Sequence, residues 1–247
     1  MSYIEKKVRR LVGRAVQRYG LIDADDRILV ALSGGVDSTS LLWLLHDRLQ
    51  RIPIPYELVA VHADLGFKAY DYSPVQAWAE SLGIQHRLIH SQFGPRAHSS
   101  KNRENPCFLC SRLRRTALFK AADNLGCNKI AFGHNLDDLI ETFFINIMYG
   151  SQVATMLPRQ PFFAGRITVV RPLALLNSET IRRFHRTRGF PAAVNPCPSK
   201  NSGRRQEIRD MLQGLYRKNR KIRGNIFHAM HNVDLEYLPC YQQKSRD

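Results

Sequence analysis

The chain has 247 residues and 44% of them are hydrophobic, enough for a packed core, which excludes a disordered or collagen-like chain. The 37 Lys and Arg residues outnumber the 21 Asp and Glu residues, and the formal net charge of +16 indicates a polyanionic partner such as RNA, DNA or an anionic membrane surface. No run approaches the roughly 18 apolar residues of a membrane span, and five scattered cysteines predict a reducing compartment, the cytoplasm, rather than a disulfide scaffold.

Apolar residues recur at helical spacing from Tyr3 to Tyr19, which predicts an N-terminal helix lying on a core. Short apolar runs of strand character then alternate with helical patterns. Strands are predicted at 27–32, 56–62, 85–89, 129–132 and 166–170. Helices are predicted from the Ser-Gly-Gly turn through Leu49 and at about 73–82, 109–125 and 136–149, with a mobile loop at 91–106. This alternation predicts an α/β fold, a parallel sheet with helices on both faces.

The C-terminal part is helical and strongly basic, so we divide the chain into a domain at 1–175 and a basic extension at 176–247. Between Ile181 and Arg223 the extension contains two acidic residues, Glu207 and Asp210, and these cations: Arg182, Arg183, Arg186, Arg188, Lys200, Arg204, Arg205, Arg209, Arg217, Lys218, Arg220, Lys221 and Arg223. The pattern favours a surface for a phosphate backbone over a merely solvated face, and tRNA is the expected partner class.

The strongest motif lies between the first predicted strand and its helix. Its two glycines permit a tight turn, and the helix start directs backbone N–H groups at the same place, a geometry that holds phosphate. The motif matches neither the Walker sequence nor the dinucleotide-binding fingerprint, and an ordinary capped turn is the alternative. Its residues are Ser33, Gly34, Gly35, Val36, Asp37 and Ser38.

This motif resembles the PP-loop of the ATP pyrophosphatases, which cleave ATP between the α- and β-phosphates and adenylate a carbonyl oxygen. The resemblance implies that residues 33–38 hold pyrophosphate and that His62 and Asp64 lie near adenosine. A carboxylate at Asp37 would repel phosphates unless a cation offset it, so the resemblance also implies Mg²⁺.

A second turn, Gly133-His134-Asn135-Leu136-Asp137-Asp138, lies between a predicted strand and helix. Ligands bind open α/β sheets outside the carboxyl ends of the strands, so this turn should face the same crevice as residues 33–38. Paired carboxylates also cap helices, which is the structural alternative. Members of the superfamily that modify nucleobases carry a similar sequence, which implies that Asp137 and Asp138 bind Mg²⁺ or activate the base. His134 either joins them or only positions the turn.

Three cysteines form a possible metal site, Cys107 and Cys110 in a C-x-x-C pair and Cys197 in a second Asn-Pro-Cys sequence. Three thiolates suit a [4Fe–4S] cluster with one open iron. A redox pair, or zinc completed by His, Cys240 or water, is equally compatible with the spacing. Cys127 precedes a buried strand and is predicted to be a core residue.

From Ile4 to about Tyr237 the chain resembles the tRNA 2-thiocytidine synthetase (TtcA) group. The stretches that carry the resemblance are 32–38, 107–115, 133–149, 170–173 and 191–197, of which CFLCSRLRR at 107–115 is the most specific. The resemblance implies that Cys107, Cys110 and Cys197 bind the cluster and that Arg114 faces the same pocket. Two departures are Val36, where the group has Lys, and Lys200, where the group completes a second C-x-x-C pair.

The activity implied by this resemblance is ATP-dependent thiolation of a tRNA base, with the C2 carbonyl of cytidine as the expected target. ATP, Mg²⁺ and a [4Fe–4S] cluster are the implied cofactors. A sulfur donor, either a cysteine desulfurase or inorganic sulfide, and a second copy in a homodimer are the other implied partners, with no membrane. Two alternatives remain open: a lysidine-synthetase-like ligase, which needs no cysteine triad, and a non-catalytic, zinc-containing RNA-binding protein.

Overall fold

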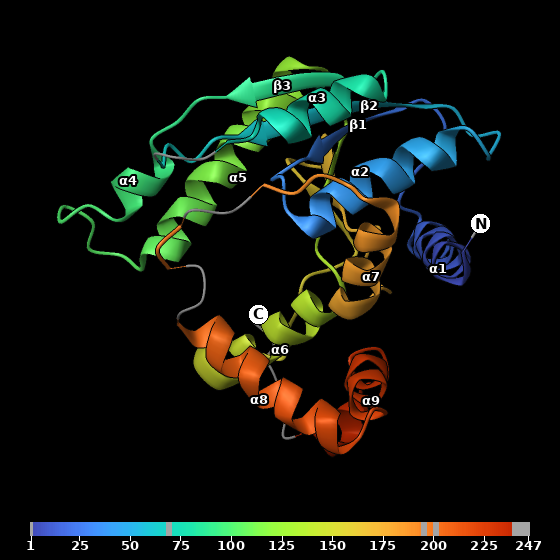
Figure 1. The fold of residues 1–247 in the computed structure, drawn as a ribbon. Helices are drawn as coiled ribbons and strands as arrows, with labels where there is room; N and C mark the ends of the chain where they lie inside the picture. Colours follow the sequence, from blue (N-terminus) through green and yellow to red (C-terminus); the bar gives the residue numbers. More distant parts are fainter. Residues whose placement is uncertain (1, 68–70, 194–196, 200–202, 239–247) are drawn as a thin grey trace, which may run out of the picture.

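A computed structural model of the chain describes residues 2–67, 71–193, 197–199 and 203–238. Within these ranges the strands form a single six-stranded sheet in the order β3-β2-β1-β4-β6-β5, parallel except for antiparallel β5 at one edge. The strands are β1 Asp26–Ala31, β2 Tyr56–Ala63, β3 Gln85–Ile89, β4 Lys129–Ala131, β5 Arg159–Phe162 and β6 Ile167–Val170. The predicted α/β class is therefore confirmed (Figure 1).

Helices connect the parallel strands. They are α1 Tyr3–Tyr19, α2 Val36–Leu49, α3 Ser73–Ser81, α4 Phe93–Ala97, α5 Pro106–Asn124, α6 Leu136–Gly150, α7 Ser178–Arg188, α8 Arg204–Lys218 and α9 Ile222–Ala229, followed by the 3₁₀ turn η1 Leu235–Tyr237. None of the helices in the described part of the chain is long and apolar enough to cross a membrane.

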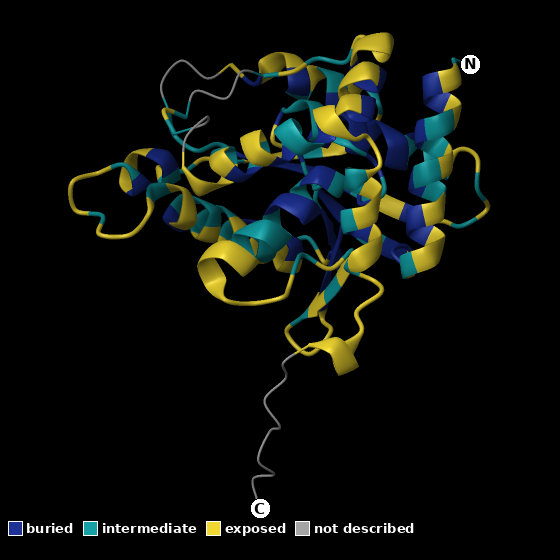
Figure 2. Cartoon of the chain, turned by 90° about the horizontal axis from the view of Figure 1, so that it is seen from below, coloured by how far each residue is buried: buried dark blue, intermediate teal, exposed yellow. Residues whose placement is uncertain are grey.

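The two faces of the sheet have separate cores. On one face, apolar side chains of α1, α2, α3 and α7 pack together, including Val8, Leu41, Val75 and Phe184. On the other face α5 contributes Leu118 and Ala122 to a smaller core with β1, β2, β4 and β6. Figure 2 shows the resulting division of α1 into a buried and an exposed stripe. Both faces are covered because the strands are apolar on both sides.

A third core lies away from the sheet and joins the C-terminal helices to the rest of the protein. Leu139 and Ile140 of α6 pack against Ile208 and Leu212 of α8 and against Phe227 of α9. Figure 1 shows α8 and α9 beneath α6, separated from the sheet by that helix. By contrast α7 belongs to the core on the sheet, although the predicted boundary at residue 175 assigned it to the extension. That boundary stays a prediction.

Several sequence-based boundaries require correction. The predicted mobile loop at 91–106 contains α4, and α5 begins at Pro106 rather than near Leu109, so Cys107 and Cys110 are both helical. Strand β5 was not predicted, because its four residues include a proline and alternate only briefly. Tyr3 was placed on the buried face of α1 but is 78% exposed.

Candidate active site

A cavity of about 610 Å³ opens where β1, β2 and β4 end. It is bordered by the turn after β1, the loop after β2, the turn after β4, two residues of α5 and Arg205 of α8. The parallel strands direct their carboxyl ends to this edge, which is where an open α/β sheet binds its ligand. Of the predicted site residues the cavity is lined by Ser33, Gly35, Val36, Asp37, Ser38, His62, Asp64, Arg114, Gly133, His134 and Asp138.

The turn after β1 has the form of an anion-binding loop. Gly34 has a φ of +77°, a left-handed conformation that a side chain would disfavour. Helix α2 then begins without a side-chain cap on its first turn. Instead, the hydroxyls of Ser38 and Thr39 donate to the Gly35 carbonyl at 2.9 and 3.2 Å. The backbone N–H groups of this first turn are thus left for a bound anion, which the helix dipole also attracts.

The turn after β4 lies in direct contact with the turn after β1. A Cβ atom on Gly133 would lie 3.1 Å from the backbone nitrogen of Ser38 and 3.2 Å from the carbonyl carbon of Asp37. Glycine at this position therefore allows the two turns to approach each other. The expectation that both signatures face one crevice agrees with this contact.

Asn135 organises the second turn by capping α6. Its side-chain oxygen accepts hydrogen bonds from the backbone N–H groups of Asp137 and Asp138, at 2.9 and 3.3 Å. The Asp138 carboxylate in turn accepts from the Asn135 N–H at 2.9 Å, which completes a capping box. These local bonds hold the Asp138 side chain beside the cavity.

The carboxyl groups of Asp37 and Asp138 are close enough to affect each other's ionisation. Burial and the nearby Asp138 carboxylate raise the pKa of Asp37 to about 7. Burial also raises the pKa of Asp138, although the Asn135 N–H and the guanidinium groups of Arg205 and Arg209 oppose that rise. Two buried carboxyls facing one cavity require a cation if both are to be ionised, and oxygen ligands of this kind suit Mg²⁺.

Asp137 is oriented differently from its neighbour. Its carboxylate pairs with Arg223 of α9 at 2.8 Å and accepts a hydrogen bond from the backbone N–H of Ser178 at 2.8 Å. Asp137 does not line the cavity. The sequence placed both carboxylates in the site, whereas the structure directs Asp138 to the cavity and Asp137 to the C-terminal helices.

Arginines of α8 complete the wall beside Asp138. Arg209 makes a two-pronged ion pair with the buried Glu141, at 2.8 and 3.1 Å. Arg205 lies 3.5 Å from the Asp138 carboxylate and 3.6 Å from that of Glu141. The sequence assigned both arginines to a general RNA surface, so the place of Arg205 at the cavity and the pairing of Arg209 with Glu141 are findings of the structure.

Both cavity histidines are neutral at physiological pH. Burial lowers the pKa of His62 to about 4, and its Nδ1 lies 2.9 Å from the Leu32 carbonyl, so that nitrogen carries the proton and donates it. Burial and the Arg171 guanidinium lower the pKa of His134 to about 3. Arg171 Nε donates to His134 Nδ1 at 3.3 Å, which places the imidazole proton on Nε2. Arg171 lies in the VRPL stretch but was not predicted as a site residue.

The loop after β2 is held by α4. The Asp64 carboxylate accepts a hydrogen bond from the Gly66 N–H at 2.9 Å, and a Cβ on Gly66 would lie 2.3 Å from the Ser91 carbonyl oxygen. A Cβ on Gly94 would likewise lie 2.4 Å from the Phe67 ring. The two segments pack too closely for larger residues, and this packing fixes Asp64 and Phe67 at the cavity.

The C-x-x-C pair occupies the first turns of α5. Asn105 caps this helix by accepting hydrogen bonds from the N–H groups of Cys107 and Phe108, at 3.0 and 3.3 Å. Cys107 is exposed and Cys110 is half-buried. Burial raises the pKa of the Cys110 thiol, Arg114 opposes the rise, and the Cys197 and Cys107 sulfurs add to it. The other two thiols therefore both lie within electrostatic range of Cys110.

Cys197 reaches this region through the segment that follows α7. The N–H of Ala193 donates to the Gly34 carbonyl at 2.9 Å, which attaches the segment to the turn after β1. The Cys197 sulfur lies 3.8 Å from His98 Nε2 of the segment after α4. Lys200, which interrupts a second C-x-x-C pair, and Cys240, the alternative zinc ligand, lie outside the described residues.

The cysteines are near each other without forming a compact site for one ion. Among the described residues, no group of three His, Cys, Asp or Glu side chains is placed to hold a single metal ion. Ligands of one zinc ion must all lie within about 2.3 Å of it, whereas a four-iron cluster spreads its thiolates over several irons. Three soft thiolates with a cationic Arg114 beside them fit a cluster of this kind.

A protein-family model described as the PP-loop domain matches residues 2–215. This chain belongs to the PP-loop family. Within that family it groups with the tRNA-cytidine(32) 2-sulfurtransferases. The PP-loop protein is 35% identical over 240 residues to the one from Cronobacter sakazakii, an alignment that covers 96% of this chain and 77% of the relative. With the one from Geobacter sulfurreducens it shares 35% over 236 residues, 94% of this chain and 92% of the relative.

Solved structures show the same fold. The U34-tRNA thiolase NcsA from Methanococcus maripaludis, which was solved with its [4Fe-4S] cluster, has a TM-score of 0.76 and 21% identity, over 97% of the PP-loop protein and 81% of the thiolase. The NH3-dependent NAD synthetase from Campylobacter jejuni has a TM-score of 0.51 and 12% identity, over 98% and 100% of the two chains. These neighbours confirm the predicted α/β fold, a parallel sheet with helices on both faces.

Proposed function

We propose that the protein is an ATP-dependent tRNA sulfurtransferase that replaces the C2 oxygen of a cytidine with sulfur. The proposal rests on one observation: a single cavity lies between the phosphate-binding turn and the helix that carries the C-x-x-C pair. The phosphate-binding turn forms one wall, and Arg114, one helical turn beyond Cys110, forms another. Relatives at 35% identity that are named tRNA-cytidine(32) 2-sulfurtransferase support the substrate.

In the first step the C2 carbonyl oxygen of the base attacks the α-phosphorus of ATP. The α–β phosphoanhydride bond breaks, pyrophosphate leaves, and the base is left with AMP on its C2 oxygen. The N–H groups at the start of α2 hold the pyrophosphate. Asp37 and Asp138 would hold Mg²⁺, which would offset their own charge and that of the phosphates.

The histidines and the loop after β2 position the nucleoside parts. His62 donates through Nδ1 to Leu32, so its Nε2 is available as an acceptor near the end of β2. His134 has the opposite tautomer, because Arg171 occupies its Nδ1. Their pKa values of about 4 and about 3 keep both rings uncharged, so neither attracts a phosphate away from the turn after β1.

In the second step sulfide attacks C2, the C2–O bond breaks, and AMP leaves with the original oxygen. A [4Fe–4S] cluster held by Cys107, Cys110 and Cys197 would supply an iron without a protein ligand, the chemistry that presents soft sulfur to carbon. Arg114 lies beside Cys110 and at the cavity, where its charge stabilises the phosphate of the leaving AMP. No net oxidation occurs when sulfide is the donor.

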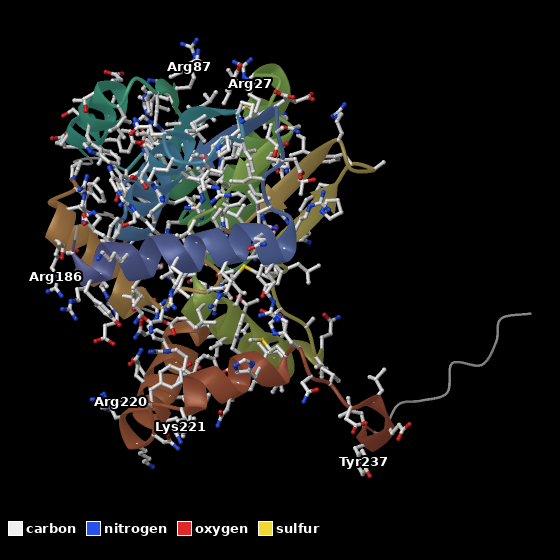
Figure 3. The ribbon with its side chains drawn as sticks, turned by 90° about the vertical axis from the view of Figure 1, so that its right-hand side faces the viewer. Arg27, Arg87, Arg186, Arg220, Lys221 and Tyr237 are labelled. Atoms are coloured by element: carbon white, nitrogen blue, oxygen red, sulfur yellow. The ribbon has the colours of Figure 1, made fainter. Side chains whose placement is uncertain are left out.

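The tRNA binds across the arginine-rich surface of α7, α8 and α9. Arg186 of α7, and Arg220 and Lys221 between α8 and α9, project outward (Figure 3). All three add positive charge outside the cavity, whereas Arg205 of α8 contributes its charge at the cavity itself. Because phosphate contacts release counterions, we expect binding to weaken with salt, with a slope of roughly 0.7–0.9 per phosphate contact. The sulfur donor and a homodimer remain predictions.

Mass spectrometry of nucleosides tests the proposal, in cells that lack the protein and are complemented with variants. Wild-type protein should restore 2-thiocytidine to bulk tRNA, and Cys197→Ala should not. Cys127→Ala is the matched control, because Cys127 is buried in a different core, behind α5. An unchanged 2-thiocytidine level in the deletion strain would overturn the proposal. A Cys197→Ala variant that still cleaves ATP when tRNA is present would favour a ligase. Zinc in place of iron in the purified protein would favour a non-catalytic RNA-binding protein.

A further inference from the structure

A second hollow adjoins the phosphate-binding turn on the side of α7. It is lined by Val36, Glu179, Arg182, His185 and Arg186. Val36 also lines the main cavity, so its side chain separates the two spaces. A phosphate chain lying on the start of α2 is therefore flanked by α7.

The position of α7 beside α2 is set by packing. Ile181 and Phe184 are fully buried in the core that α2 shares, and the Phe184 ring lies 5.6 Å from the Trp43 ring of α2. This contact fixes the orientation of α7, so that the adjacent face of the helix, which carries Arg182, borders the hollow. The guanidinium is thus delivered by a rigid helix rather than by a loop.

Three arginines around the turn after β4 already have partners within the described residues. Arg205 faces Asp138 and Glu141, and Arg223 is paired with Asp137. Arg171 donates to the Leu157 carbonyl and to His134. By contrast, among the residues that the structure describes, Arg182 forms no salt bridge within 4.0 Å.

The phosphate-binding turn itself contains no cation. Its six residues are Ser33, Gly34, Gly35, Val36, Asp37 and Ser38, and Asp37 is acidic. The apolar Val36 side chain leaves open the space toward Arg182 in the hollow.

We propose that Arg182 supplies from α7 the phosphate-binding cation that position 36 lacks. It is a binding residue for the pyrophosphate portion of ATP and for the pyrophosphate product. The inference rests on the proposed use of ATP and adds a residue to that site.

Calorimetric titration of the full chain with magnesium pyrophosphate tests this assignment without tRNA or sulfur transfer. Arg182→Ala should raise the Kd of pyrophosphate about tenfold, since a charge-assisted contact is lost, and Arg182→Lys should lose less. Arg87→Ala is the matched control: it removes the same charge from β3, where the exposed side chain points outward and lines neither the hollow nor the main cavity (Figure 3). Its Kd should stay within about twofold of the wild type.

The decisive variant moves the cation. In the double variant Val36→Lys with Arg182→Ala, the new ammonium enters the same hollow from α2, and the Kd should return to within about threefold of the wild type. Circular dichroism confirms that each variant is folded. An unchanged Kd for Arg182→Ala, an equal loss for Arg87→Ala, or no recovery in the double variant would overturn the assignment.

These outcomes are separate from those of the proposed function. Pyrophosphate binding that depends on Arg182, in a protein whose deletion leaves 2-thiocytidine unchanged, would retain the inference and reject the reaction. Normal thiolation by Arg182→Ala, with unchanged pyrophosphate affinity, would retain the reaction and reject the inference.

Discussion

The turns after β1 and β4 have the same strand-turn-helix form but are stabilised in different ways. The turn after β1 closes through its own residues, with Ser38 and Thr39 donating to Gly35. The turn after β4 also has a local cap at Asn135. Its two carboxylates, however, form ion pairs with Arg205 and Arg223, which lie far away along the chain. One turn is a local structure, and the other depends on the C-terminal helices.

This difference separates two neighbouring carboxylates that look equivalent in the sequence. Asp138 lines the cavity, while Asp137 links α6 to α7 and α9. Substituting each of them should therefore damage different properties of the protein.

The largest effect is expected for Asp138→Asn. Its amide oxygen can still accept the hydrogen bond from the Asn135 N–H, so the cap on α6 is kept, but the charge that would bind Mg²⁺ is lost. We expect the thiolation rate to fall about 100-fold or more, with the thermal midpoint of unfolding unchanged or higher. Single-turnover thiolation and thermal denaturation measure both. A rate within about tenfold of the wild type would exclude Asp138 from the chemistry.

Asp137→Ala should act mainly on stability. The change removes the partner of the mostly buried Arg223 and the acceptor of the Ser178 N–H. We expect the free energy of unfolding to fall by about 3 kcal/mol, measured by urea denaturation. Asp210→Ala serves as the control, because Asp210 is exposed and contacts only Gln206 among its described hydrogen-bond partners. Equal stability of the two variants would contradict the assigned role.

Gly133→Ala tests the contact between the two turns. The added Cβ would lie 3.1 Å from the Ser38 nitrogen and 3.2 Å from the Asp37 carbonyl carbon, so the start of α2 must shift. We expect a loss of stability of about 1–3 kcal/mol and a several-fold higher Kd for magnesium pyrophosphate. Gly214→Ala on α8 is the control, because nothing lies within 4 Å of its added Cβ. Unchanged affinity in Gly133→Ala would show that the turns are independent.

The smallest effect concerns pH and Asp37. Its pKa is about 7 in the folded protein and about 3.8 when unfolded, so the folded state binds more protons between these values. Without metal, the contribution of Asp37 to stability is greatest below about pH 4 and is lost as the pH rises through about 7. Asp37→Asn should remove this loss and melt a few degrees above the wild type at about pH 8, with little difference at about pH 4. If the wild type were more stable than Asp37→Asn at about pH 8, that result would contradict the raised pKa of Asp37.

Sequence patterns were sufficient to predict elements whose conformation depends on neighbouring residues. The strand at 85–89 was predicted with its observed bounds, and the glycines at 34 and 133 marked turns that do need them. The pattern did not find α4, because its five residues include Gly94 and Pro95 and its role is to pack against Phe67. Nor did it find the cavity position of Arg205 or the contact of Arg171 with His134, because each arginine is far along the chain from its partner.

The sequence by itself determined the α/β class, the phosphate-binding turn and the residue types of the site, because periodicity, glycine placement and side-chain chemistry are properties of short segments. Only the tertiary structure decided which of two adjacent aspartates faces the cavity, which arginines among many enter the wall, and how the segment carrying Cys197 reaches the turn after β1. These choices depend on packing between segments about 40 to 160 residues apart, as with Gly34 and Ala193 or Asp137 and Ser178, and no local pattern encodes such distances.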